Sequence, residues 1–391
     1  MFGALEKEQV QDVLDTGVLM RYGFDGMRQN HWKAKQLEEA LTQNMQTGYA
    51  HAVSSGTAAL TVALASAGIG AGDEVIMPTF TFVASFESIL ALGAVPILVD
   101  IDDTLTLNPE AVEKAITKNT KVVMPVHMCG SMADLEALQS ICKKHHLLLL
   151  EDACQAIGGS YHQKPLGSIG DLGCFSFDFV KTVTCGEGGA LITNNKTFYE
   201  NAHMYSDHGH DHFRNDRGAE THPFLGYNFR ISELNAAVGC AQINRLEEFV
   251  AIQKKHYSVL REVLGSVEGV TFRRVPEGGE ENYSFLNFFL PTEELTRKAH
   301  KALGGAGVDG CFYWYDNNWH YYRKWEHLIH KKSLGKLSQD VLERLPDYTT
   351  SVFSASDHWM GRTISCLIKL GWTEEEVRKR AQKMADVLGD L

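Results

Sequence analysis

The chain of 391 residues lacks an excess of positive charge, a long apolar run and a regular cysteine spacing. It carries 37 Lys and Arg against 49 Asp and Glu, and the resulting net charge of -12 disfavours nucleic acid or an anionic membrane as partner. The longest apolar run, SILALGAVPILV, is too short to cross a bilayer and is interrupted by Gly93 and Pro96. We therefore expect a protein that binds no nucleic acid and does not enter a membrane.

The eight cysteines show no CxxC spacing and mostly lie inside apolar runs. We interpret them as buried free thiols of a reducing compartment, not as a disulfide framework. The first residues, MFGALEKEQVQDVLDTG, carry acidic and basic side chains early, unlike a signal peptide. These features predict a cytoplasmic protein.

Short apolar runs alternate with helix-like segments from about residue 50 to residue 195. The expected strands are AHAVSS, DEVIMP, AVPILVD, KVVMPVH, LLLLED, CFSF and ALITNN, and the expected helices span residues 57–67, 82–92, 109–116 and 132–145. Asn108 and Pro109 suit the N-cap and first position of the third helix. The runs VVMPV and LLLL do not alternate in polarity, so both of their faces should be buried. The pattern predicts an α/β domain with a mostly parallel sheet flanked by helices.

The pattern changes after residue 245. A long helical stretch over residues 235–264 leads into a mixed region and a final helix, TEEEVRKRAQKMADVL. Thr373 and the glutamate three residues later form a capping box for this last helix. We expect residues 1–245 to form an N-terminal segment and a large domain, and residues 246–391 to form a smaller α+β domain.

Four groups follow the predicted strands, and the carboxyl ends of parallel strands form the ligand crevice. SSGTAAL opens a helix whose free amides suit a phosphate, and PTFTF offers aromatic rings. Asp152 follows LLLLE, and Lys181 follows CFSF within SFDFVKTVTCGEGG. An anion site, a carboxylate, a lysine and a flat aromatic surface in one crevice predict pyridoxal phosphate. Taken singly, Lys181 could be a surface lysine, Asp152 a helix cap and Phe82 a core residue.

Several motifs together resemble a known family. They are SSGTAAL, GDEVIMPTFTFVA, VDID, EDACQA, FSFDFVKTVTCGEGG and GYNFRISELNAA. The chain is similar to the DegT/DnrJ-type sugar aminotransferases, which are pyridoxal phosphate enzymes of fold type I, the aspartate aminotransferase fold. The resemblance covers almost the whole chain and is strongest over residues 48–240. It implies a homodimer with shared active sites, L-glutamate as amino donor, a keto-sugar as acceptor and no metal ion.

The resemblance assigns four residues to the cofactor ring. Lys181 would hold the cofactor as a Schiff base and then move a proton. Asp152 would pair with the ring nitrogen, Gln155 would bind the ring hydroxyl, and Phe82 would stack on the ring. Lys181 and Asp152 are thus the expected catalytic residues.

The resemblance also assigns residues to the phosphate group. The backbone amides of Thr57 and Ala58 and the hydroxyl of Ser176 would bind it. Asn228, within GYNFR, would reach the phosphate held by the neighbouring subunit.

The expected acceptor follows from similarity to the family members that form 8-amino-3,8-dideoxy-manno-octulosonate, an amino sugar acid of bacterial lipopolysaccharide. The acceptor would then be the 8-oxo form of 3-deoxy-manno-octulosonate, whose carboxylate needs a cationic partner. The candidates for that partner are Arg230, Arg273, Arg274 and Lys369. Residues 312–322, FYWYDNNWHYY, suit contact with a sugar and equally suit core or dimer packing.

Other functions stay open at this point. The first alternative is an aminotransferase for a nucleotide-linked 3- or 4-keto-6-deoxy hexose, although CLIKLGW stands where relatives often have a His-Pro pair. A sugar dehydratase is disfavoured because such relatives carry histidine at the position of Lys181. A non-catalytic regulatory protein that binds pyridoxal phosphate is a further alternative. A Rossmann dehydrogenase is disfavoured because GIGAG (68–72) is not GxGxxG and follows a helix-like segment.

The histidine-rich segment over residues 207–212, within SDHGHDHF, carries potential metal ligands. Adjacent residues of this kind rarely converge on one ion, so a zinc hydrolase is a weak alternative. We expect a solvated loop near the mouth of the site.

Overall fold

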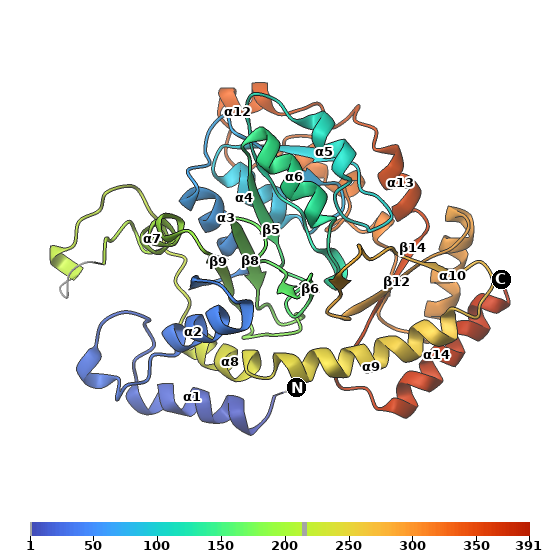
Figure 1. Cartoon of the computed structure of the whole chain (residues 1–391), viewed down its shortest axis with the longest axis horizontal. Coiled ribbons are helices and arrows are strands. Elements are labelled where there is room, and N and C mark those ends of the chain that lie inside the picture. Colours follow the sequence, from blue (N-terminus) through green and yellow to red (C-terminus); the bar gives the residue numbers. More distant parts are fainter. Residues whose placement is uncertain (1, 213–216) are drawn as a thin grey trace.

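The computed structural model describes residues 2–212 and 217–391, and Figure 1 shows a large sheet covered by helices beside a smaller unit. The large sheet has the strand order β1-β9-β8-β5-β4-β2-β3. Its strands are β1 (Tyr49–Val53), β2 (Glu74–Pro78), β3 (Val95–Val99), β4 (Thr120–Val123), β5 (Leu148–Asp152), β8 (Leu172–Ser176) and β9 (Gly189–Thr193). β9 runs antiparallel to both of its neighbours, and the other pairings are parallel. These are the seven expected strands, so the mostly parallel α/β sheet is confirmed.

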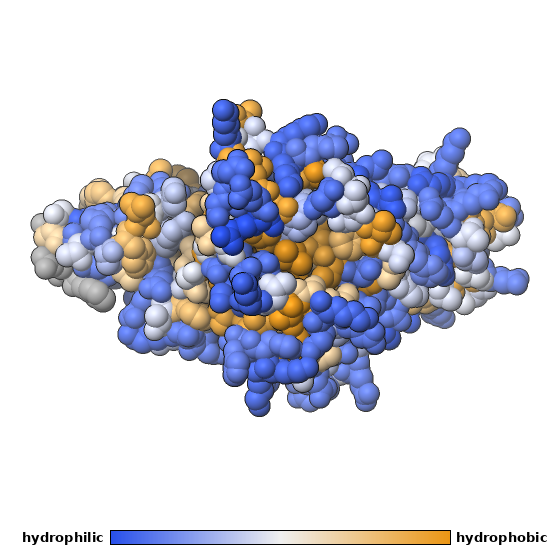
Figure 2. Space-filling model, turned by 90° about the horizontal axis from the view of Figure 1, so that it is seen from above, coloured by the Kyte–Doolittle hydropathy of each residue, from blue (hydrophilic) through white to orange (hydrophobic). Residues whose placement is uncertain are grey.

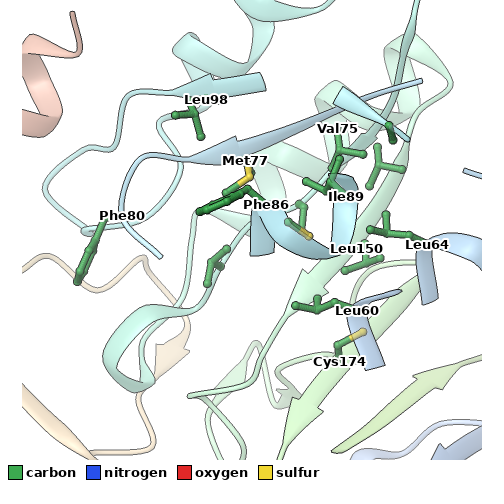
Figure 3. Close-up of a cluster of buried hydrophobic side chains, with 14 of the residues drawn as sticks. Leu60, Leu64, Val75, Met77, Phe80, Phe86, Ile89, Leu98, Leu150 and Cys174 are labelled. Carbon is green, nitrogen blue, oxygen red and sulfur yellow. The ribbon is translucent and has the colours of Figure 1, made fainter. Parts of the chain in front are cut away.

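Both faces of this sheet are buried, which explains the continuous apolar runs. Leu149 belongs to the core under α5 and α6, whereas Leu150 belongs to the core under α3 and α4, since successive strand residues point to opposite faces. Figure 3 shows Leu60 and Leu64 of α3 near Leu150. The flanking helices are α2 (Lys33–Met45), α3 (Gly56–Ser66), α4 (Ala84–Ala91), α5 (Pro109–Ala115), α6 (Leu135–His145), α7 (Lys196–Tyr205) and α8 (Glu233–Ile243).

The expected helices form with small changes at their ends. The Asn108 side chain accepts hydrogen bonds from the first turn of α5, and Pro109 is its first residue, as predicted. The stretch expected as one helix over residues 235–264 is two helices, α8 and α9 (Leu246–Leu264). Asn244 and Arg245 separate them, because Arg245 leaves the helical conformation at ψ 9°. The GIGAG segment is a turn between α3 and β2, with Gly68 and Gly72 at positive φ.

The smaller unit has a four-stranded sheet of order β10-β12-β14-β13. Its elements are β10 (Thr271–Phe272), β12 (Phe285–Phe289), α10 (Glu293–Gly305), β13 (Cys311–Phe312), β14 (Thr363–Leu367) and α14 (Glu374–Gly389). The predicted capping box of α14 is present. Some residues after residue 246 pack into the core of the large sheet and not into the smaller unit, namely Trp314, Tyr321, Trp325 and Met360. The domain boundary at residue 246 coincides with the start of α9 and stays a prediction.

The remaining elements are short or peripheral. They are α1 (Ala4–Thr16), η1 (Asp25–Met27), η2 (Met128–Gly130), β6 (Ser160–Tyr161), β7 (Lys164–Pro165), η3 (Arg217–Ala219), β11 (Gly279–Glu280), η4 (Trp314–Asp316), η5 (Tyr322–Lys324), α11 (Glu326–Ile329), α12 (Gln339–Arg344) and α13 (Ser354–Met360). In the part of the chain that the structure describes, no helix combines the length and apolarity needed to span a membrane. All eight cysteines are free thiols. Seen from above, hydrophobic residues gather in the middle of the surface between hydrophilic flanks (Figure 2).

Candidate active site

A cavity of about 440 Å³ lies at the carboxyl ends of the central strands. Six of the predicted residues line it, namely Thr57, Phe82, Asp152, Gln155, Ser176 and Lys181. Asp152 and Ser176 are the last residues of the adjacent parallel strands β5 and β8. The fold thus brings these side chains together at the sheet edge where the sequence placed them.

The first turn of α3 forms one end of the cavity. Ser55 is the N-cap, and its hydroxyl accepts the Ala58 amide at 3.0 Å. Gly56 and Thr57 both line the cavity. Their amides belong to the first turn, whose N–H groups have no intrahelical acceptor, so they suit an anion. A Cβ on Gly56 would lie 2.7 Å from Ser176 Cβ, so only glycine lets α3 start this close to β8.

The side chain of Asp152 is buried and lines the same cavity. Its Oδ2 accepts the Ser85 hydroxyl at 2.9 Å, and its Oδ1 accepts the Cys154 amide at 3.2 Å. Ser85 Oγ lies 2.6 Å from Thr81 Oγ1. This hydroxyl chain could not be predicted, because Thr81 and Ser85 lie far from Asp152 in the sequence and meet it only in the fold.

Lys181 lies in the turn that follows β8. Its backbone amide donates to the Asp178 carbonyl at 3.0 Å, and its side chain is half-buried. Gly186 at φ 82° turns the chain back toward β9, as expected for the GEGG segment. Lys181 therefore lies in the connection over residues 177–188, whose two ends are the adjacent antiparallel strands β8 and β9.

A second cavity of about 540 Å³ adjoins the first. The two share the lining residues Cys154, Gln155, Val180, Lys181 and His320. The walls of the second cavity include the rings of Phe285, Phe312 and Trp314, and Lys369. Lys181 thus lies between a cavity with an anion end and one with aromatic walls and a further cation.

His320 is a site residue that the sequence indicated only as part of the aromatic stretch. Its ring lies 5.4 Å from that of Phe82 and 4.4 Å from that of Trp314. Burial lowers the pKa of His320 to about 3, and nearby Lys181 adds to the effect. The imidazole is therefore neutral, and its Nδ1 lies 3.0 Å from Asn317 Oδ1. Tyr321 and Tyr322 are buried, so the stretch serves both the site and the core.

Three of the four proposed partners for a substrate carboxylate line neither cavity. Arg230 binds Asp207, Arg274 binds Asp102 and Asp103, and buried Arg273 binds Glu281. Lys369 alone of the four lines the second cavity, and its Nζ lies 2.5 Å from Asp309 Oδ2. Asn228, exposed on the surface, lines neither cavity of its own chain.

The histidine-rich segment differs from the expected solvated loop. Asp207 is buried against Arg217 and Arg230, and the His212 ring packs on Tyr22. These ion pairs and ring contacts hold the segment against the N-terminal region, and none of its residues 207–212 lines either cavity. Across residues 2–212 and 217–391, no cluster of three His, Cys, Asp or Glu side chains could hold a metal ion. Phe213, at the end of SDHGHDHF, lies outside the described residues.

Comparisons with known proteins agree with this geometry. The model of the DegT/DnrJ/EryC1/StrS aminotransferase family matches residues 3–348. A 3-amino-5-hydroxybenzoate synthase of Amycolatopsis mediterranei is 37% identical over 78% of this chain and 77% of its own. A GDP-perosamine synthase of Escherichia coli O157:H7 is 35% identical over 67% of this chain and 69% of its own. A crystal structure of 3-amino-5-hydroxybenzoic acid synthase superposes with a TM-score of 0.82 at 29% identity, covering 100% of this chain and 98% of the other.

The chain belongs to the DegT/DnrJ/EryC1/StrS aminotransferase family. It is a sugar aminotransferase of fold type I, and its cofactor is pyridoxal phosphate. The residues of the first cavity fit this group, because they offer the free amides of a helix start and the Ser176 hydroxyl for an anion, the buried carboxylate of Asp152 and the amine of Lys181. A zinc hydrolase or a dehydrogenase does not account for this combination, and the family match favours an aminotransferase over a non-catalytic regulator.

Proposed function

We propose that the chain transfers an amino group from L-glutamate to a keto-sugar acid, the 8-oxo form of 3-deoxy-manno-octulosonate. The observation that carries this choice is Lys369. It is the one member of the predicted cation set that lines the aromatic-walled cavity beside Lys181. A carboxylate on Lys369 would leave the other end of the acceptor near Lys181.

Lys369 can meet a carboxylate without leaving its present partner unpaired. Asp309 also accepts from Arg380 Nη1 at 2.8 Å, and the Arg380 side chain is largely buried. If Lys369 turned toward a substrate, Arg380 would still neutralise Asp309. The ring of Trp319 is exposed and that of Phe312 is half-buried, and both rings suit contact with the apolar faces of a sugar ring.

We propose that pyridoxal phosphate binds in the first cavity, which Lys181 lines together with the other residues assigned to the cofactor ring. Lys181 Nζ would hold the cofactor covalently, Asp152 would keep its ring nitrogen protonated, Gln155 would bind its ring hydroxyl, and Phe82 would cover its ring. When bound, pyridoxal phosphate supplies an electron-accepting ring. Lys181, once free, is positioned to take a proton from the α-carbon of a donor and to return it. Ser85 holds Asp152 in place through its hydroxyl.

The phosphate contacts follow the free amides of α3. We propose the Thr57 amide and hydroxyl, the Gly56 amide and the Ser176 hydroxyl as its ligands. The Ala58 amide, which the resemblance assigned to the phosphate, already donates to Ser55. It would bind the phosphate only after exchanging that bond.

We further propose a homodimer with shared active sites. Phe179 and Val180, next to Lys181, are 69% and 73% exposed, and Leu225 near Asn228 is 89% exposed. Phe179 and Val180 also line the cavities, and apolar side chains this exposed support the proposal of a surface that a second copy covers. Asn228 would then reach the partner's phosphate site. The cytoplasmic location and the role in lipopolysaccharide synthesis stay predictions.

A nucleotide-linked 3- or 4-keto-6-deoxy hexose is the second candidate acceptor. The GDP-perosamine synthases among the relatives support it. Such an acceptor carries a diphosphate in place of a carboxylate.

Absorbance spectroscopy tests the function and the acceptor in one cuvette. L-Glutamate should remove the visible band of the cofactor-loaded protein, and Lys181→Ala should show no such change. The 8-oxo sugar acid should then restore the band in the aminated protein. If only a GDP-linked keto-hexose restored the visible band, the acceptor would be the second candidate and not the sugar acid. No band change with L-glutamate would contradict the proposed donor.

A further inference from the structure

The orientation of the Gln155 amide is fixed by a single backbone group. The amide of Cys129 donates to Gln155 Oε1 at 2.9 Å. A backbone N–H can only donate, so the oxygen of Gln155 must face Cys129 and its NH₂ group must point away. Gln155 lines both cavities, so its NH₂ is the group available to an acceptor there.

The loop that carries this amide has an unfavourable conformation of its own. Cys129 adopts φ 56° and ψ 35° within η2, and Gly130 follows at φ 76°. A non-glycine residue in the left-handed region costs about 1 kcal/mol or more. Contacts from elsewhere must therefore hold the loop in place.

Those contacts come from Arg273, just after β10. Its Nη1 donates to the Met128 carbonyl at 2.8 Å and its Nη2 to the Cys129 carbonyl at 2.7 Å. The guanidinium is buried, and Glu281 Oε1 accepts from its Nε at 3.0 Å and from its Nη2 at 2.8 Å. A planar fork that binds two successive carbonyls fixes the orientation of the peptide between them.

Asn282, the neighbour of Glu281, holds the loop from the other side. Its amide nitrogen donates to the backbone carbonyl of Gln155 at 3.0 Å, and its backbone amide donates to the Gly130 carbonyl at 2.9 Å. The segment from Arg273 to Asn282 thus binds both the loop and Gln155.

We propose that Arg273 is a positioning residue for the cofactor site: paired with Glu281, it holds the Met128–Gly130 loop so that the Gln155 amide presents its NH₂ to the ring hydroxyl of pyridoxal phosphate. The inference rests on the proposed role of Gln155. It replaces the earlier expectation that Arg273 binds a substrate carboxylate. A buried charge of the small unit thereby sets the hydrogen bonding of a group in the loop that follows β5.

The test uses the cofactor-loaded full chain and reads the visible absorbance band against pH together with the dissociation constant of pyridoxal phosphate. Arg273→Lys keeps the charge and loses the fork. The double variant Arg273→Met with Glu281→Leu removes both charges, so no unpaired carboxylate is left to unfold the protein. Gln155→Ala is the reference, and Arg274→Lys is the matched control, because Arg274 binds Asp102 and Asp103 instead of the loop.

We expect both Arg273 changes to shift the pH at which the visible band titrates, in the same direction as Gln155→Ala does. They should also raise the dissociation constant of pyridoxal phosphate about two- to tenfold. Combined with Gln155→Ala, they should add no further shift. The proposal would be overturned if folded Arg273→Lys showed the same dependence of the band on pH as the wild-type protein. It would also be overturned if the shifts of the Arg273 and Gln155 variants added together. Neither result would contradict the role of Gln155. No shift in Gln155→Ala itself would overturn both.

Discussion

Ser85 Oγ and Asp152 Oδ2 lie 2.9 Å apart, and this hydrogen bond joins the start of α4 to the end of β5 beneath the cofactor cavity. Asp152 is thereby oriented by a residue 67 positions away in the sequence. The other oxygen of the carboxylate, Oδ1, accepts the Cys154 amide at 3.2 Å. The side chain that would pair with the ring nitrogen is thus fixed before any ligand arrives.

Removing the charge of Asp152 should abolish most turnover. We expect Asp152→Asn to lower kcat about 10²- to 10³-fold, because a neutral amide no longer stabilises a protonated ring nitrogen. Ser85→Ala should lower kcat only about tenfold, since it removes one hydrogen bond and keeps the charge. Steady-state kinetics with L-glutamate measures both. Equal losses in the two variants would show that orientation matters more than charge.

A methyl group at Gly56 should disturb the phosphate end of the cavity. Gly56→Ala would place Cβ 2.7 Å from Ser176 Cβ, so α3 or β8 must shift. We expect about 1–3 kcal/mol of lost stability and weaker binding of pyridoxal phosphate. Gly304→Ala in α10 is the control: its Cβ meets nothing within 4 Å, and it should be neutral or stabilising. Urea unfolding with and without cofactor compares them.

Lys369 should determine recognition of an acidic acceptor. Lys369→Met is expected to raise KM for the 8-oxo sugar acid about tenfold or more with a smaller change in kcat. Lys298→Met removes an exposed lysine of α10 that pairs with Glu294 and should leave KM unchanged. If KM for the sugar acid is the same in both variants, Lys369 does not bind the carboxylate.

Mixed dimers can test the role of Asn228. Lys181→Ala and Asn228→Ala should each be nearly inactive alone. Random mixing of the two variants makes half of the dimers mixed. If Asn228 acts in the partner's site, each mixed dimer has one site in which both residues are native. The mixture should then show about a quarter of the wild-type activity. Size-exclusion chromatography verifies the dimer. A mixture as inactive as its components would show that Asn228 does not act across the interface.

The histidine-rich segment should make the fold acid-sensitive. Burial lowers the pKa of His212 to about 4, below the unfolded value of about 6.5, so the unfolded chain binds more protons between these values. Stability is therefore complete above pH 6.5 and decreases as pH falls toward 4. We expect His212→Asn to reduce that decrease by about 1 kcal/mol, and by no more than about 2 kcal/mol, measured by urea unfolding at pH 7 and pH 5. Exposed His208→Asn is the matched control, and an equal decrease in the two variants would contradict the prediction.

Much of the site could be predicted because local sequence and sheet topology act together. The carboxyl ends of parallel strands meet at one edge, so Asp152 at the end of β5 and Ser176 at the end of β8 lie at the same edge of the sheet. The capped start of α3 after β1 and the lysine turn after β8 follow the same rule. Asn108, Pro109 and Thr373 marked helix starts because caps act within one turn.

The sequence by itself thus determined the succession of strands and helices along the large domain and the cofactor class. Only the tertiary structure decided that Ser85 holds Asp152, that His320 stays neutral beside Lys181, and that Lys369 and not Arg273 faces the second cavity. These outcomes depend on contacts between segments far apart in the chain. Burial and partner distance set them, and neither quantity is encoded in a local pattern.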